Sequence, residues 1–143
     1  MDKQFEKGCV LVIGGSGGVG NACVQRFYAD GAKVVFTYNQ NETAAKSLKE
    51  ACKNQVNYFK LANQESEQVK TLMDSLAEQY GGINTLINAA GFNIPQKLIS
   101  EITPDLWRKV IDEDVNGFFN IVSASLPHLR ATKGSHVFIS SAC

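Results

Sequence analysis

The sequence has 143 residues, of which 44% are apolar and 20% charged, and its 14 basic side chains balance its 14 acidic ones. This length suits one domain with a single sizeable core. The zero formal charge argues against nucleic-acid binding driven by phosphate attraction, and the longest apolar runs are far below the roughly 18 residues that span a bilayer. The polar start, Met1–Lys7, lacks the apolar core of a secretory signal. We therefore expect a cytoplasmic protein with neither a nucleic-acid nor a membrane partner.

Short β-like runs alternate with longer helix-like segments along the chain. The first run, Gly8–Ile13, is apolar and is followed by glycines, as expected of a strand buried on both faces. In chain order we predict a strand at Gly8–Ile13, a helix at Asn21–Asp30, a strand at Lys33–Thr37, a helix at Glu42–Lys53, a strand at Gln55–Lys60, a helix at Ser66–Tyr80, a strand at Ile83–Asn88, helices from about Thr103 and over Val115–Arg130, and a strand at Ser135–Ser140. Strict alternation predicts an α/β fold, a Rossmann-like doubly wound parallel sheet of at least five strands in three α/β/α layers.

The cysteines and histidines do not predict a metal site. The cysteines lie far apart in sequence and form no Cys-x-x-Cys pair, so we expect buried or free thiols. Both histidines are interpreted as structural. These residues are Cys9, Cys23, Cys52, Cys143, His128 and His136.

A glycine-rich loop, residues 14–20, leads from the first predicted strand directly into the first predicted helix. The amide groups and dipole of a helix start favour a phosphate, and glycine lets the backbone approach it closely. Two dinucleotide fingerprints overlap in this loop. Gly-x-Gly-x-x-Gly is formed by Gly15, Gly17 and Gly20, whereas Gly-x-x-x-Gly-x-Gly is formed by Gly14, Gly18 and Gly20. The loop alone does not choose between them.

Two later motifs favour the second spacing. The fourth predicted strand ends in Asn88-Ala89-Ala90-Gly91, and the fifth ends in Ser140-Ser141. Together with the glycine loop these motifs resemble the short-chain dehydrogenase/reductase family, whose pattern is Thr-Gly-x-x-x-Gly-x-Gly, Asn-Asn-Ala-Gly, Ser and Tyr-x-x-x-Lys. The resemblance covers essentially the whole chain. It implies an NAD(P)(H)-dependent oxidoreductase that transfers hydride between the nicotinamide and a carbonyl or secondary alcohol.

The resemblance also implies roles for individual positions. Ser141 aligns with the serine that hydrogen-bonds the substrate oxygen. The asparagine of the family's proton relay falls at Asp114, and a helix irregularity would bring in Asn116 instead. The implied cofactor-binding residues are Gly14, Ser16, Gly17, Gly18, Val19 and Gly20 in the glycine loop, Thr37, Tyr38 and Asn39 at the second strand, Ala62 and Asn63 after the third, and Asn88, Ala89, Ala90 and Gly91 at the fourth.

Several positions depart from the family pattern. Ile13 replaces the usual threonine, so a hydroxyl that braces the loop is lost, and Ala89 replaces the second asparagine. The segment Thr37–Asn41 contains no acid to accept hydrogen bonds from the ribose hydroxyls of NAD, and no arginine lies between Arg26 and Arg108. The missing acid weakly favours NADP(H), with NAD(H) as the alternative.

The Tyr-x-x-x-Lys motif does not occur in the sequence. By the resemblance, the tyrosine that acts as general acid/base would follow Cys143. We therefore expect an NAD(P)-binding domain, residues 1–143, that is cut before this segment. An apolar edge at Val137–Ile139 with no neighbouring strand supports the same expectation. The alternative is a non-catalytic nucleotide-binding sensor or interaction module, which Ala89 and Asp114 favour.

The helix predicted at Val115–Arg130 has more apolar side chains than one sheet face needs, including Phe118, Phe119, Ile121 and Val122. Members of the short-chain dehydrogenase/reductase family, which the sequence resembles, often form dimers or tetramers through the corresponding helix. We therefore expect a homo-oligomer that acts on a small-molecule substrate.

Overall fold

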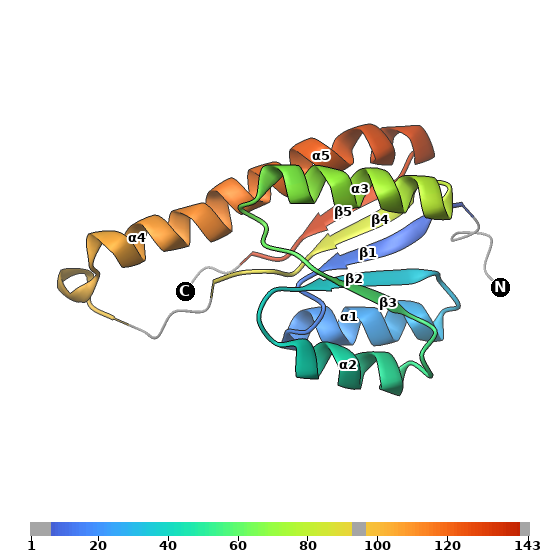
Figure 1. Cartoon of the computed structure of the whole chain (residues 1–143), viewed down its shortest axis with the longest axis horizontal. Helices are drawn as coiled ribbons and strands as arrows, with labels where there is room; N and C mark the ends of the chain where they lie inside the picture. Colours follow the sequence, from blue (N-terminus) through green and yellow to red (C-terminus); the bar gives the residue numbers. More distant parts are fainter. Residues whose placement is uncertain (1–6, 93–96, 141–143) are drawn as a thin grey trace.

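The computed structural model describes residues 7–92 and 97–140. Within these residues five parallel strands form one sheet in the order β3-β2-β1-β4-β5 (Figure 1). The strands are β1 (Cys9–Ile13), β2 (Val34–Tyr38), β3 (Asn57–Lys60), β4 (Ile83–Asn88) and β5 (Ser135–Phe138), and the α-helices are α1 (Gly18–Ala29), α2 (Glu42–Ala51), α3 (Ser66–Tyr80), α4 (Pro104–Val110) and α5 (Gly117–Thr132). The predicted doubly wound α/β fold is confirmed.

Helices cover both faces of the sheet, with α1 and α2 on one face and α3 and α5 on the other (Figure 1). The central strand β1 shows how the sequence produces this arrangement, because successive side chains of a strand point to opposite faces. Val10 and Val12 belong to the core cluster on the α1/α2 side, whereas Leu11 and Ile13 belong to the cluster on the α3/α5 side. All of β1 is buried, which explains its unbroken apolar sequence.

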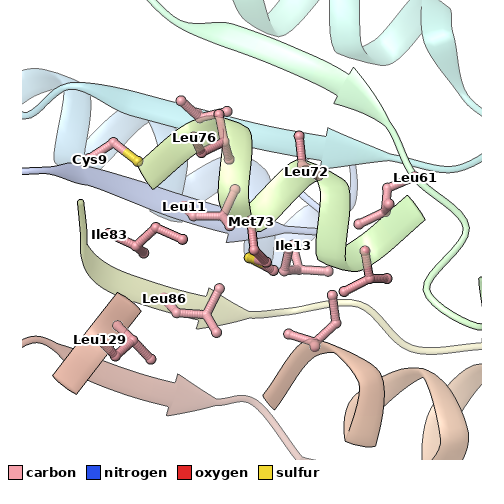
Figure 2. Close-up of a cluster of buried hydrophobic side chains, with 13 residues drawn as sticks. Cys9, Leu11, Ile13, Leu61, Leu72, Met73, Leu76, Ile83, Leu86 and Leu129 are labelled. Atoms are coloured by element: carbon pink, nitrogen blue, oxygen red, sulfur yellow. The ribbon is translucent and has the colours of Figure 1, made fainter. Parts of the chain in front are cut away.

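The apolar stripe of α3 forms the centre of the second core. Leu72, Met73 and Leu76 pack with Leu11 of β1 and Leu86 of β4 (Figure 2). Their spacing places them on one face of the helix. Burying each such side chain stabilises the fold by about 1.5–3 kcal/mol. The observed bounds of α3 equal the predicted ones because this pattern is strongly periodic.

The first helix begins earlier than predicted, at Gly18 rather than at Asn21. This start includes the last glycines of the loop in the helix and sets its buried face. Gly20 and Val24 are buried, whereas Ala22 is exposed.

The two helices predicted in the second half are joined by a π-helix, Ile111–Asn116. The first of these two, α4, starts as predicted, with Pro104 at its first position. The Thr103 hydroxyl caps it by accepting a hydrogen bond from the Leu106 amide at 3.2 Å. In Figure 1, α4 continues the line of α5 beyond the end of the sheet. The π-helix is the helix irregularity that the sequence analysis left open. A short 3₁₀ helix, Ile99–Glu101, precedes α4 and was not predicted.

β5 is an edge strand of the part of the sheet that the structure describes, and its Val137 and Phe138 side chains are 44% and 46% exposed. No helix within residues 7–92 and 97–140 is long and apolar enough to cross a bilayer. Cys9 and Cys52 are buried and free, and Cys23 is half-buried and free. Burial raises the pKa of the Cys9 thiol to about 12. Cys143 lies outside the described residues.

Candidate functional site

The glycine loop turns sharply between β1 and α1. Gly14 has a φ of +77°, and a Cβ at this position would lie 2.8 Å from the Cα of Ala90. A Cβ at Gly20 would collide with the carbonyl oxygen of Gly14. Both glycines are therefore needed for the loop to pack on itself and on the segment after β4.

The start of α1 faces open space. Gly17 is the N-cap of α1, no side chain caps the helix, and its first turn contains no acid. Gly18 is exposed, and a Cβ there would meet nothing within 4 Å. An uncapped helix start leaves backbone N–H groups available for an anion such as a phosphate. Packing within the described residues therefore does not require glycine at position 18.

Thr37 of β2 holds the start of the glycine loop through two hydrogen bonds. Its hydroxyl accepts a hydrogen bond from the Gly14 N–H at 3.2 Å, and its carbonyl oxygen accepts one from the Gly15 N–H at 2.9 Å. The hydroxyl expected to be lost with Ile13 is thus supplied by a neighbouring strand, while the Ile13 side chain is fully buried in the core.

A cavity of about 420 Å³ lies beside this loop. Its walls are the segments that follow β1, β2, β3 and β4, together with the π-helix. Ligands of doubly wound folds bind at this edge, outside the carboxyl ends of the strands. The lining residues are Gly14, Ser16, Gly17, Asn39, Gln40, Asn41, Leu61, Asn63, Gln64, Ala89, Ala90, Gly91, Phe92, Glu113 and Asp114.

The cavity brings together about half of the residues implied to bind the cofactor. These are Gly14, Ser16, Gly17, Asn39, Asn63, Ala89, Ala90 and Gly91. The others, Gly18, Val19, Gly20, Thr37, Tyr38, Ala62 and Asn88, are not among its lining residues.

Several of these other residues shape the walls instead of lining them. Gly18, Val19 and Gly20 form the first turn of α1. Thr37 and Tyr38 are buried within β2, and burial raises the pKa of the Tyr38 hydroxyl. Asn88 is also buried, and its Oδ1 accepts a long hydrogen bond of 3.4 Å from the Ala90 N–H.

Six lining residues were not among the sequence-derived site residues. Each lies within two positions of a residue that was, so extending each motif along the chain would have found them. Asn41 additionally caps α2, since its Oδ1 accepts a hydrogen bond from the Ala44 N–H at 2.9 Å. The six are Gln40, Asn41, Leu61, Gln64, Phe92 and Glu113.

The π-helix places only one of the two proton-relay candidates at the cavity. Asp114 lines it, and its Oδ1 accepts a hydrogen bond from the Phe92 N–H at 2.7 Å. Asn116 is exposed, and its amide donates to Asp112 Oδ1 at 2.8 Å within the same helix. Ser141, the remaining catalytic candidate, lies outside the described residues.

The charges of the cavity are unevenly distributed. Glu113 and Asp114 are its charged residues, and no Lys or Arg occurs among the lining residues that the structure describes. The wall after β2 consists of the uncharged carboxamides of residues 39–41. Glu42, the next acid, is not part of the lining and pairs with Lys46 at 3.1 Å.

Both histidines lie away from the cavity. His128 Nε2 is 2.8 Å from Asp74 Oδ1, which links α5 to α3. The His136 ring stacks on Phe118, and its buried Nε2 has no hydrogen-bond partner among the described residues. Within residues 7–92 and 97–140, no group of three or more His, Cys, Asp or Glu side chains is arranged to hold a metal ion.

Sequence comparisons identify relatives with about twice the length of this chain. The sequence model of the short chain dehydrogenase family matches residues 8–143. L-fucose dehydrogenase of Rattus norvegicus is 31% identical over 132 residues, which are 92% of this chain and 48% of the relative. Glucose 1-dehydrogenase 2 of Bacillus subtilis (strain 168) is 30% identical over an alignment 148 residues long, which covers 99% of this chain and 57% of the relative.

Solved structures agree with the fold. A short-chain dehydrogenase from Streptomyces avermitilis has a TM-score of 0.84 and 27% identity, covering 99% of this chain and 51% of that one. ElxO with NADP bound has a TM-score of 0.82 and 25% identity, covering 94% of this chain and 56% of that one. The chain thus spans about half the length of the relatives that it matches. Since one family model matches the glycine loop, the sheet and nearly every other residue, the chain belongs to the short-chain dehydrogenase family.

Proposed function

We propose that the cavity binds NAD(P)(H) and that the chain is the cofactor-binding part of an oxidoreductase. The observation that carries this proposal is the uncapped start of α1, where Gly17 lines the cavity and the next residue, Gly18, is exposed with open space beside it. An anionic pyrophosphate fits these N–H groups and the helix dipole. The Gly17 N–H donates to the Gly14 oxygen at 3.1 Å, so the N–H groups of residues 18–20 and the Ser16 side chain would hold the pyrophosphate. Asn39 and Asn63 would hold the adenosine half.

When bound, the nicotinamide supplies or accepts the hydride, and we propose a carbonyl or secondary alcohol as the substrate group. The relatives named L-fucose dehydrogenase and glucose 1-dehydrogenase 2 support this substrate class. Asp114 fixes the loop after Gly91 through its hydrogen bond to the Phe92 N–H. Ser141 would hydrogen-bond the substrate oxygen by its position in the family pattern.

We further propose that NADP(H) binds more tightly than NAD(H). The wall after β2 has three carboxamides and no carboxylate among its described residues, so no charge there repels the additional phosphate of NADP. ElxO, a structural neighbour, has NADP bound. Titration of NADPH and NADH compares the two dissociation constants, and tighter NADH binding would contradict this preference.

The exposed apolar side chains of α4 and α5 support a homo-oligomer. Val115 of the π-helix and Phe119 and Leu126 of α5 have a spacing that places them along one side of the helical segment, and Phe119 is 66% exposed. Trp107 of α4 is also exposed. Exposed apolar side chains on one side of a helical segment are typical of a protein contact. We propose that a second copy of the chain packs against it in a dimer or tetramer.

A second candidate function is a nucleotide-binding module without turnover. It is favoured by Asp114, which stands where the resemblance places a relay asparagine and whose Oδ1 is hydrogen-bonded to the backbone. Calorimetric titration with NADPH, followed by an assay of hydride exchange between NADPH and carbonyl compounds, separates the two. Binding with exchange supports the oxidoreductase, binding without exchange supports the module, and no binding contradicts both.

A further inference from the structure

The loop between β3 and α3 forms one wall of the cavity through Asn63 and Gln64. It has little regular structure of its own. In one of its described backbone hydrogen bonds the Glu65 N–H donates to the Ala62 oxygen at 3.0 Å, and in another the Leu61 N–H donates to the Tyr38 oxygen at 2.9 Å. The Glu65 oxygen accepts the first hydrogen bond of α3, from the Val69 N–H at 3.0 Å. The position of residues 63 and 64 therefore depends on contacts with another element.

That element is α5. The side-chain amide of Asn120 donates to the carbonyl oxygen of Asn63 at 3.0 Å and to that of Gln64 at 3.2 Å. One nitrogen thus holds two consecutive peptide groups of a loop that lies 56 and 57 residues away in sequence. Neither bond belongs to the sheet or to a helix. Their effect is to orient the loop relative to α5.

Gly117 brings the loop and the helix close enough for these bonds. A Cβ at Gly117 would lie 2.9 Å from the Cβ of Asn63, a separation that real side chains do not tolerate. Gly117 is the first residue of α5, and Asn120 follows three positions later on the same side of the helix. The first turn of α5 therefore has one side fitted to this loop.

The same helical segment also contacts a second wall of the cavity. Asp114, in the π-helix directly before α5, accepts the hydrogen bond from the Phe92 N–H at 2.7 Å. Residues 114–120 thus contact the loops after β3 and after β4, which both line the cavity. Asn120 itself is not among the lining residues, so a substitution at Asn120 would change the cavity by moving its walls.

We propose that Asn120 is a positioning residue for dinucleotide binding, which sets the wall formed by Asn63 and Gln64 through its two hydrogen bonds. This inference rests on the proposed function, since it concerns the same cavity. The property of Asn120 that matters here is the N–H donor of its side-chain amide. Asn120→Asp keeps the shape of the side chain and replaces the donor with an oxygen that repels both carbonyl groups, whereas Asn120→Gln keeps a donor.

The test is calorimetric titration of NADPH and of ADP-ribose, which lacks the nicotinamide. We expect Asn120→Asp to weaken the binding of both ligands by about tenfold, since each lost hydrogen bond accounts for a change in the dissociation constant of about tenfold or less. Asn120→Gln should retain binding within about threefold. Amide hydrogen exchange of residues 61–66 should accelerate in Asn120→Asp and not in Asn120→Gln. Gln79→Glu, the same exchange of amide for carboxylate at an exposed position of α3, controls for charge.

The outcomes separate this inference from the proposed function. If the wild-type chain binds NADPH and Asn120→Asp binds it equally well, the role of Asn120 is overturned while the cofactor site stands. If the wild-type chain binds neither NADPH nor ADP-ribose, both are overturned. Gly117→Ala provides an independent variant, because its Cβ would push the loop away from α5, and it should weaken NADPH binding in the same direction.

Discussion

The region from β1 to α2 and the region from α4 to β5 differ in how far the chain covers its own apolar side chains. In the first region every residue of β1 and β2 is buried. In the second, Trp107, Phe119 and Phe138 are 54%, 66% and 46% exposed. We call the first the closed region, because its large apolar side chains are covered apart from Val19, which is 53% exposed. The second is the exposed region, because it presents several large apolar side chains to solvent.

This difference shows that one apolar spacing can have two structural outcomes. Leu72 and Leu76 of α3 are four residues apart and buried. Val115 and Phe119 have the same separation and are exposed. The periodicity predicts which side chains share a helix face, but what covers that face depends on elements elsewhere in the chain or in a partner.

The largest expected effect concerns the glycine loop of the closed region. In Gly20→Ala the new Cβ would collide with the backbone of Gly14. We therefore expect the free energy of unfolding to fall by about 3 kcal/mol and the dissociation constant for NADPH to rise by at least about a hundredfold. Urea unfolding and calorimetry measure the two quantities.

Gly18→Ala is the matched control, because its Cβ meets nothing within 4 Å. It should leave stability unchanged or raise it by up to about 1 kcal/mol, since alanine favours a helix. If glycine is present for the ligand, the same variant still weakens NADPH binding. Equal stability loss in both variants would contradict the distinction between packing and ligand glycines.

The next effect concerns the exposed region. Phe119→Asp places a charge in the apolar stripe, so we expect the oligomer to dissociate with a cost of about 2–4 kcal/mol for the contact. Light scattering measures the mass of the assembly. Ala29→Asp, at an exposed position of α1 in the closed region, should leave that mass unchanged. A monomeric wild-type protein would show that a second copy does not cover this surface.

A smaller effect is expected at the junction of the two regions. Asp114→Ala removes the acceptor of the Phe92 N–H, and such bonds to a charged group contribute about 1.5–3 kcal/mol. We expect the exchange rate of the Phe92 amide hydrogen to rise by at least about tenfold. Asp114→Asn keeps an acceptor and should show a much smaller rise. Unchanged exchange in Asp114→Ala would mean that this bond does not hold the loop.

The smallest effect concerns His136, which lies on β5 and stacks on Phe118. Burial lowers its pKa from the ordinary 6.5. The unfolded chain then binds a proton more readily than the folded one, so the free energy of unfolding should fall as the pH drops below about 6.5. His136→Phe should flatten this dependence in urea unfolding. An equally steep decline in the variant would assign it to other groups.

Much of the fold followed from the sequence because its patterns are local. The predicted bounds of α3 and β4 equal the observed ones, since α3 is strongly periodic and β4 lies between the glycines 81–82 and the motif that begins at Asn88. The start of α1 was misplaced because glycines carry no periodic signal, although Gly18 and Gly20 lie within the helix.

The candidate site was predictable where it lies next to a motif. Ser16, Asn39 and Ala90 line the cavity and were found from the motifs. The contact between Asn120 and the loop after β3 has no such signal, because it joins residues more than fifty positions apart. A helix irregularity near Asp114 was left open by the sequence, but its form and position were not predicted, because a π-helix of six residues gives no separate apolar pattern.

The central claim is that the cavity beside the glycine loop binds a nicotinamide dinucleotide. Calorimetric titration of the wild-type chain with NADPH tests it most directly, with Gly20→Ala as the variant that disrupts the loop. We predict one site per chain with a dissociation constant on the order of micromolar, and loss of that binding in Gly20→Ala. A folded wild-type chain that binds none of NADPH, NADP, NADH and NAD would contradict the account.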